Sequence, residues 1–199
     1  MAAKKSFLAK KRTLILRISF LLILTIILLD NNFSAYSLDL DSKTSILFSC
    51  VGFILVVLGG FGRIWSSLYV EGFKTKKLIK DGPYSIVRNP LYFFSLMIFI
   101  GMCFALKSTE VSLALFLVFA LFHIPTILNE EKVLLSTHDE SYKTYYDNTP
   151  RLIPNILKYR RTKPEDRIEI KIKKINNVLW ETMGYLFLFT VIDLFYFFQ

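Results

Sequence analysis

The chain has 199 residues, of which 53% are hydrophobic, with 19 phenylalanines and a formal net charge of +9. Long uncharged apolar runs dominate it, and ordinary soluble domains lack such runs, so the composition favours an integral membrane protein. The basic residues fall in alternate loops between these runs, which explains the charge by membrane topology and argues against a nucleic-acid partner.

Five apolar segments approach the roughly 20 residues that a membrane-spanning helix needs. They are apolar all round and lack the alternation of barrel strands, so the sequence predicts an all-α fold with about five transmembrane helices. The predicted spans are residues 13–29, 44–61 (extending toward Tyr69), 91–106, 111–128 and 178–198. Only residues 107–110 separate the third and fourth spans, which are expected to form a tight antiparallel hairpin.

Lysine and arginine are abundant before the first span, between the second and third, and after the fourth, and scarce in the two other loops. This alternation predicts a cytoplasmic N-terminus, because cytoplasmic loops carry the excess of basic residues. We expect residues 1–199 to form a single integral membrane domain embedded in the lipid bilayer. Residues 155–177 are predicted to be a charged cytoplasmic segment before the last helix.

Residues 82–92 (GPYSIVRNPLY) place two prolines, an arginine and an asparagine directly before the third span. Asn89 precedes a proline and is biased to extended geometry, whereas Pro90 suits the first turn of a helix. A rigid loop is therefore expected to deliver Arg88, Asn89 and Tyr92 to a helix N-terminus. Free N–H groups at such an end favour a carboxylate or phosphate.

A second polar region follows the fourth span, where Glu130 and Glu131 are adjacent. Either the fourth helix ends near these glutamates, or it continues to Leu135 with both of them in solvent. Three tyrosines then follow at the spacing of one face of a short amphipathic helix, which Asp139 could cap. They are Tyr142, Tyr145 and Tyr146. Both polar regions flank the hairpin on the cytoplasmic side, a set that suits a zwitterionic or cationic cofactor facing a lipid-soluble substrate.

The stretches GPYSIVRNPLYFFSLMIFIG and EEKVLLSTHDESYKTYYDNTPRLIP, in this order around a hairpin, resemble the isoprenylcysteine carboxyl methyltransferase and phospholipid methyltransferase family. The resemblance covers a core at residues 71–154. It implies an integral membrane enzyme that transfers a methyl group from S-adenosylmethionine (SAM) to a lipophilic small molecule or lipidated substrate. It also implies a cofactor pocket at the cytoplasmic end of the hairpin, with the active site facing the cytoplasm.

The resemblance carries site residues over by position. The implied cofactor-binding residues are Lys76, Lys77, Leu78, Ile79, Tyr84, Asn89, Pro90, Leu91, Tyr92 and Glu130. The candidate catalytic residues are Arg88, Glu131 and Arg151, and the candidate substrate contacts are Thr126 and Tyr142.

Two positions depart from the family pattern. Asn89 stands where many members have histidine, so a proton-shuttling role is not expected there. Thr126 stands where prenylcysteine methyltransferases carry an arginine, and threonine cannot clamp a carboxylate with two hydrogen bonds. A phospholipid amine, a thiol or a hydroxyl is therefore as credible an acceptor as an isoprenylcysteine carboxylate.

Two other functions stay open from the sequence. The first is an NADPH-dependent membrane reductase of the sterol-reductase type, against which the paired glutamates argue, because a dinucleotide phosphate needs a basic pocket. The second is a non-catalytic membrane protein that binds lipid. The two cysteines, Cys50 and Cys103, lie inside predicted spans without metal-ligand spacing, so we expect packing roles for them and no metal site.

Overall fold

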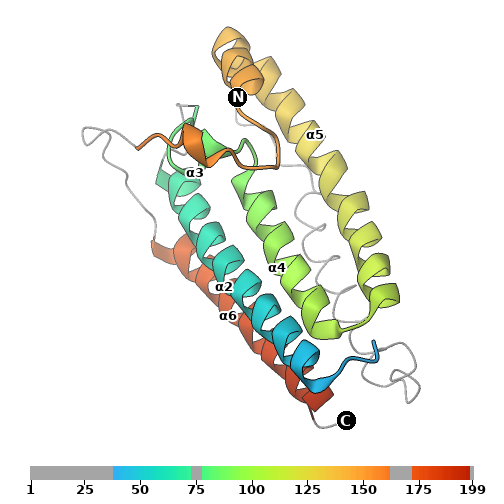
Figure 1. Ribbon diagram of the computed structural model, residues 1–199. Helices are drawn as coiled ribbons and strands as arrows, with labels where there is room; N and C mark the ends of the chain where they lie inside the picture. The colour runs from blue at the N-terminus through green and yellow to red at the C-terminus, as the bar shows by residue number, and fades with distance from the viewer. Residues whose placement is uncertain (1–37, 73–77, 162–171, 198–199) are drawn as a thin grey trace. The chain divides into compact units, whose positions relative to one another are not determined.

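The computed structural model describes residues 38–72, 78–161 and 172–197, and these residues form helices and loops without a strand (Figure 1). The helical elements are α2 (Ser42–Gly72), α3 (Pro83–Ile86), α4 (Pro90–Leu106), α5 (Thr109–Asn148), η2 (Ile156–Lys158) and α6 (Ile172–Phe197). They all belong to one compact unit, Asp39–Gln199. The predicted all-α class is confirmed for this part of the chain, and the predicted span at residues 13–29 lies outside the described residues.

Three of these helices are long and apolar enough to cross a membrane. Their apolar portions are Ser42–Val70 in α2, Thr109–Thr137 in α5 and Ile175–Tyr196 in α6. The helix α4, Pro90–Leu106, is equally apolar in character but shorter. These elements coincide with the second to fifth predicted spans, and we conclude that the chain is an integral membrane protein.

The centre of the bundle is the contact between α2 and α4, which run side by side (Figure 1). Glycine makes this close approach possible, because a Cβ atom at Gly101 would lie 2.6 Å from the carbonyl oxygen of Gly52. Small residues allow membrane helices to pack backbone against backbone in this way. The helix α6 packs along α2, and α4 also touches α6 and α5.

The turn between α4 and α5 is as short as the sequence predicts. Lys107 adopts a left-handed conformation with φ of 48°, and Ser108 caps α5 by accepting a hydrogen bond from the N–H of Val111. The Lys107 ammonium lies 3.3 Å from the carboxylate of Asp193 on α6. This ion pair joins the turn to the last helix at the end of the bundle opposite α3.

The structure corrects the prediction for the end of α5. This helix continues without interruption through Pro125 to Asn148, so residues 139–146 belong to α5 and not to a separate amphipathic helix, and position 139 is not a helix N-terminus. Pro125 removes only its own backbone donor, and the following residues up to Asn148 include neither glycine nor proline. The helix thus extends beyond its apolar portion, and Glu130 and Glu131 lie within one continuous helix.

The close contact at Gly101 predicts a stability effect. We expect Gly101→Ala to lower the free energy of unfolding by about 1–3 kcal/mol, because the added methyl group overlaps the backbone of α2. Gly184→Ala in α6 is the matched control, since a Cβ there meets nothing within 4 Å, and it should leave stability unchanged or slightly higher. Thermal unfolding of both variants in detergent measures the difference. Equal melting temperatures would contradict the close packing.

Candidate active site at the start of helix α4

The loop before α4 is held by residues 149–161, which we call the return segment because they bring the chain back from α5 to α3. Four backbone groups make these links. Gly82 N–H donates to Arg160 O (2.8 Å), Arg160 N–H to the Ser85 hydroxyl (2.9 Å), Asn155 N–H to Ile86 O (2.9 Å) and Arg88 N–H to Pro150 O (2.8 Å). The two polar regions predicted from sequence therefore meet, and they meet mainly through backbone hydrogen bonds.

Gly82 is needed where the loop turns into α3. Its φ of 60° favours glycine, and a Cβ atom there would lie 2.2 Å from the ring of Tyr69. Ser85 closes the turn by donating its hydroxyl proton to Gly82 O at 2.7 Å. The Tyr145 hydroxyl also donates to Tyr84 O at 2.7 Å, which ties the far end of α5 to the same loop.

Glu131 is the centre of the polar contacts. Its side chain is 4% exposed, and its two carboxylate oxygens have different partners. Asn89 Nδ2 donates to Oε1 at 2.8 Å, and Arg151 Nε donates to Oε2 at 3.0 Å. Arg88 Nε lies 3.6 Å from Oε1. A buried carboxylate is stable only with positively charged neighbours and hydrogen-bond donors. Here these partners come from the start of α4, the loop before it and the return segment.

Arg88 is nearly as buried as Glu131, with an 8% exposed side chain. Its guanidinium lies over the ring of Tyr146, 3.7 Å from the centroid, and donates to Tyr146 O at 3.1 Å. Arg151 Nη2 donates to the Tyr146 hydroxyl at 3.1 Å, so one tyrosine contacts both arginines. The three predicted catalytic residues, Arg88, Glu131 and Arg151, thus form one cluster.

Glu130 lies on a different face of α5 from its neighbour and is exposed. Burial, and after it the nearby Tyr145, Glu130 and Tyr92, raise the pKa of Tyr84 above the ordinary value for tyrosine. Three of the predicted cofactor residues, Tyr84, Tyr92 and Glu130, are therefore close enough to interact electrostatically. Carboxylates and tyrosine rings are both groups that can bind a cation.

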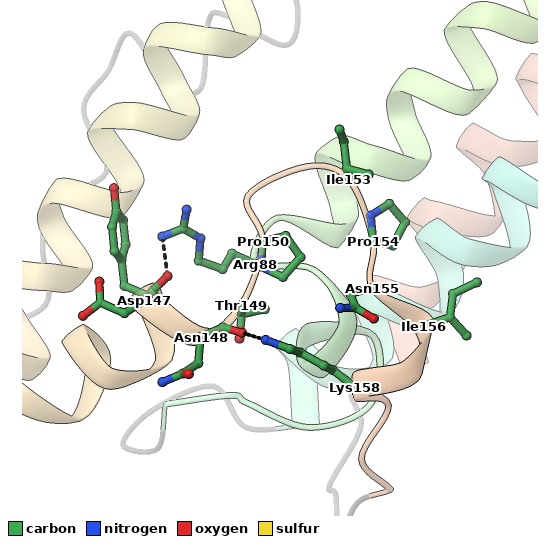
Figure 2. Close-up of a pocket in the computed structure, with 11 residues that line it drawn as sticks. Arg88, Asp147, Asn148, Thr149, Pro150, Ile153, Pro154, Asn155, Ile156 and Lys158 are labelled. Carbon is green, nitrogen blue, oxygen red and sulfur yellow. Dashed lines mark hydrogen bonds between the residues drawn. The ribbon is translucent and has the colours of Figure 1, made fainter.

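An open hollow of about 790 Å³ is lined in part by Arg88. The last turn of α5 and the return segment form its walls, and Figure 2 shows Arg88 and Lys158 both reaching toward that turn. The Lys158 ammonium donates to Asn148 O. The apolar wall of the hollow consists of Pro150, Ile153, Pro154 and Ile156. We call this hollow the groove.

The remaining predicted site residues take varied positions. Lys76 and Lys77 lie outside the described residues, and Leu78 and Ile79 are half-buried at the start of the loop. Pro90 is buried and Leu91 half-buried in the first turn of α4, where Tyr92 N–H already donates to Asn89 O at 3.1 Å. Thr126 is half-buried and donates to Phe122 O within α5.

Tyr142 is only 1% exposed and packs against Tyr145 and Tyr146. A substrate contact at Tyr142 stays a prediction.

Sequence reasoning missed the residues that line the groove, apart from Arg88. Asn155 and Lys158 belong to the stretch after the second motif, which carries no recognisable pattern. Tyr146 was visible only as one of three tyrosines on a helical face. Their common property, proximity to Arg88, arises from the return of the chain to α3 and has no local signal.

Comparison with known proteins finds a family that is similar to part of this chain. Residues 47–141 match the family described as phospholipid methyltransferase. This segment contains most of α2, all of α3 and α4, and most of α5, and it includes Arg88, Asn89 and both glutamates. This match confirms the resemblance drawn from the sequence motifs.

Two curated proteins are similar to this chain. One is the cobalt-zinc-cadmium resistance protein CzcN of Cupriavidus metallidurans, 36% identical over 55% of this chain and 50% of that protein. The other is the nickel-cobalt-cadmium resistance protein NccN of Alcaligenes xylosoxydans xylosoxydans, 32% identical over 60% of this chain and 56% of that protein. The chain thus spans about half the length of these relatives. No solved structure matches it. Within the described residues, no three His, Cys, Asp or Glu side chains gather so as to hold a metal ion.

The two adjacent glutamates are expected to differ in their contribution to stability. Glu131→Ala should lower the free energy of unfolding by about 3 kcal/mol, because it leaves Arg88 buried without its carboxylate. Glu130→Ala removes an exposed side chain and should change stability by less than about 0.5 kcal/mol. Thermal or denaturant unfolding in detergent compares them. A similar loss in both variants would show that Glu131 has no special role in the fold.

The buried tyrosines predict a loss of stability at alkaline pH. Burial and the charge of Glu131 raise the pKa of Tyr142 to about 12, and burial raises the pKa of Tyr145 as well. Between about pH 10 and 12 the unfolded chain loses these protons while the folded protein keeps them, so stability is full below pH 10 and falls as the pH rises. Tyr142→Phe should make this decline shallower. Unfolding midpoints measured from pH 8 to 11 test it, and parallel declines would contradict it.

Proposed function

We propose that the protein is a membrane methyltransferase that uses SAM to methylate a lipophilic acceptor. The observation that carries this proposal is the joining of Glu131 to Asn89, Arg88 and Arg151, which fixes the start of α4 against α5 inside the segment that matches the phospholipid methyltransferase family. Such a cluster gives a rigid frame at the place where the family resemblance puts the cofactor.

The face with Tyr84, Tyr92 and Glu130 is the proposed cofactor site. SAM would supply an electrophilic methyl group on a positively charged sulfur. Aromatic faces attract such cations, and the exposed Glu130 carboxylate suits the ammonium or ribose hydroxyls of the cofactor. The Tyr92 N–H in the first turn of α4 already donates to Asn89 O, so it is not available to a charged group of the cofactor. The cofactor would therefore be contacted mainly by the shape of this turn, which is formed by Asn89, Pro90 and Leu91. We retain Leu78 and Ile79 as proposed apolar contacts.

Glu131, Arg88 and Arg151 would act by positioning. Both Glu131 oxygens already accept hydrogen bonds, so this carboxylate has little capacity to take a proton from an acceptor. Methyl transfer requires the nucleophile and the methyl donor to be held in line, and correct placement alone can contribute many orders of magnitude in rate. Arg151, whose side chain is 41% exposed, is the member of the cluster that can reach an acceptor group.

The acceptor would approach from the apolar side. An aromatic row connects α4 with α5 below the site, with Tyr92 edge-on to His123 at 5.8 Å and His123 stacked on Phe119 at 3.9 Å. Phe119 lies 5.0 Å from Phe99 on α4, which continues the row into the apolar part of the bundle. Thr126 follows His123 on α5 and supplies a hydroxyl in place of a charge. We therefore propose an amine, thiol or hydroxyl on a lipid-like molecule as the methyl acceptor.

A contribution to metal tolerance is a second candidate, favoured by the names of the two resistance proteins that resemble this chain. We propose that any such contribution depends on the methyltransferase site. A metal-sensitive bacterial host expressing the protein should then tolerate cadmium better than one expressing Glu130→Ala. Equal tolerance in the two strains would separate the two functions.

The first test is cofactor binding to the detergent-purified protein by calorimetry. We expect saturable binding of SAM that weakens at least about tenfold, or 1.4 kcal/mol, in Glu130→Ala. The matched control is Glu140→Ala, which removes another exposed glutamate from α5 and should bind SAM as the unchanged protein does. NADPH serves as the comparison ligand.

The outcomes separate the remaining functions. Binding of NADPH without SAM would assign the protein to the reductase class. Binding of neither ligand by the folded protein would favour a non-catalytic role in lipid binding. Equal SAM affinity in Glu130→Ala and the unchanged protein would remove Glu130 from the site.

A further inference from the structure

The return segment exposes apolar side chains beside the site. In residues 153–161, which we call the anchor segment, the exposed fractions are 83% for Ile153, 75% for Ile156 and 98% for Leu157. These three large side chains occupy five consecutive positions on a short loop outside the main helices. Large apolar side chains exposed together on one loop mark a surface that meets another apolar phase.

The patch is held in a defined conformation. Asn155 N–H donates to Ile86 O, and the Asn155 side chain caps η2 by accepting from Leu157 N–H at 3.2 Å. Arg160 O accepts from Gly82 N–H at the other end of the anchor segment. The apolar side chains are therefore presented by a structured loop that is fixed at both ends to the α3 region.

The position of Tyr159 relates the anchor segment to the membrane. The ring of Tyr159 lies 6.2 Å from the ring of Trp65. Trp65 belongs to the apolar portion of α2, which ends at Val70. Trp65 is five residues from that end, or roughly 8 Å along the helix axis at about 1.5 Å per residue. Tryptophan and tyrosine favour the boundary between hydrocarbon and headgroups. The anchor segment therefore lies at the depth of one membrane surface.

The charges on the anchor segment are all basic. Lys158, Arg160 and Arg161 are exposed and directly follow the apolar side chains. Arg160 has an acidic neighbour, with Nε 3.8 Å from Asp81 Oδ1, and Lys158 contacts a backbone oxygen of α5. Basic side chains beside a membrane-inserted apolar patch attract anionic lipid headgroups.

We propose that the anchor segment inserts Ile153, Ile156 and Leu157 into an anionic lipid leaflet, with its basic residues on the headgroups. The same stretch of chain forms the apolar wall of the groove and directly follows Arg151, which binds Glu131 at 3.0 Å. Membrane contact would thus hold both the groove and the Arg151 side of the ion cluster at the lipid surface. This inference requires a membrane protein but does not depend on methyl transfer.

The test measures membrane depth at single labelled positions. In a Cys50→Ala, Cys103→Ala background, Leu157→Cys carries an environment-sensitive fluorophore, and the protein is placed in vesicles containing spin-labelled lipid as quencher. The matched control is Thr144→Cys, an exposed position on α5 beyond the apolar portion that ends at Thr137. Circular dichroism and elution volume in detergent confirm that each labelled variant folds like the parent.

We expect lipid quenching at position 157 to exceed that at position 144 by roughly twofold or more, and to increase when phosphatidylglycerol is added to phosphatidylcholine vesicles. Equal quenching at the two positions would overturn the insertion. Quenching at position 157 that does not change when phosphatidylglycerol is added would overturn the role of the basic residues. Protection of position 157 that appears only when other membrane proteins are added would assign the patch to a protein partner.

Discussion

The buried carboxylate of Glu131 is the interaction on which the candidate site depends. A charged group that is 4% exposed is stable only with compensating partners, and here they come from three separate parts of the chain. Asn89 belongs to the start of α4, Arg88 to the loop before it, and Arg151 to the return segment. Satisfying this one charge therefore fixes the relative positions of α4, α5 and the loop between α2 and α4.

The uninterrupted α5 makes this arrangement possible. Because the helix continues past Pro125 and beyond its apolar portion, adjacent residues point to different surroundings: Glu131 into the protein and Glu130 outward. One carboxylate is then available for structure and the other for a ligand. The same continuity carries Tyr142, Tyr145 and Tyr146 over the α3 loop, where Tyr145 donates to Tyr84 O and Tyr146 lies under Arg88.

Polar contacts also recur between the apolar helices. Arg63 on α2 reaches Glu181 on α6 and Ser95 on α4, both at 2.8 Å, and Lys107 pairs with Asp193 near the opposite end of the bundle. In an apolar medium such groups need partners from neighbouring helices. These pairs therefore help to fix how the helices are oriented relative to one another, in addition to the glycine-based packing of α2 on α4. No local sequence pattern indicates these pairs, because the basic partners of Glu181 and Asp193 lie on other parts of the chain, 118 and 86 residues away.

The sequence by itself determined the helical class, the positions of four apolar helices and the resemblance to the phospholipid methyltransferase family, because apolar length and the two motifs are local properties of the chain. It also placed the functional region near residues 82–92 and 130–151, although the roles of those residues stay predictions. Tertiary structure alone decided that α5 is one helix, that Glu131 is buried while Glu130 is exposed, and that Tyr142 is buried. It also created the groove and the anchor segment, since both arise where residues 149–161 return to α3. This return depends on backbone hydrogen bonds. Almost any residue can make such bonds, so no local sequence pattern predicts them.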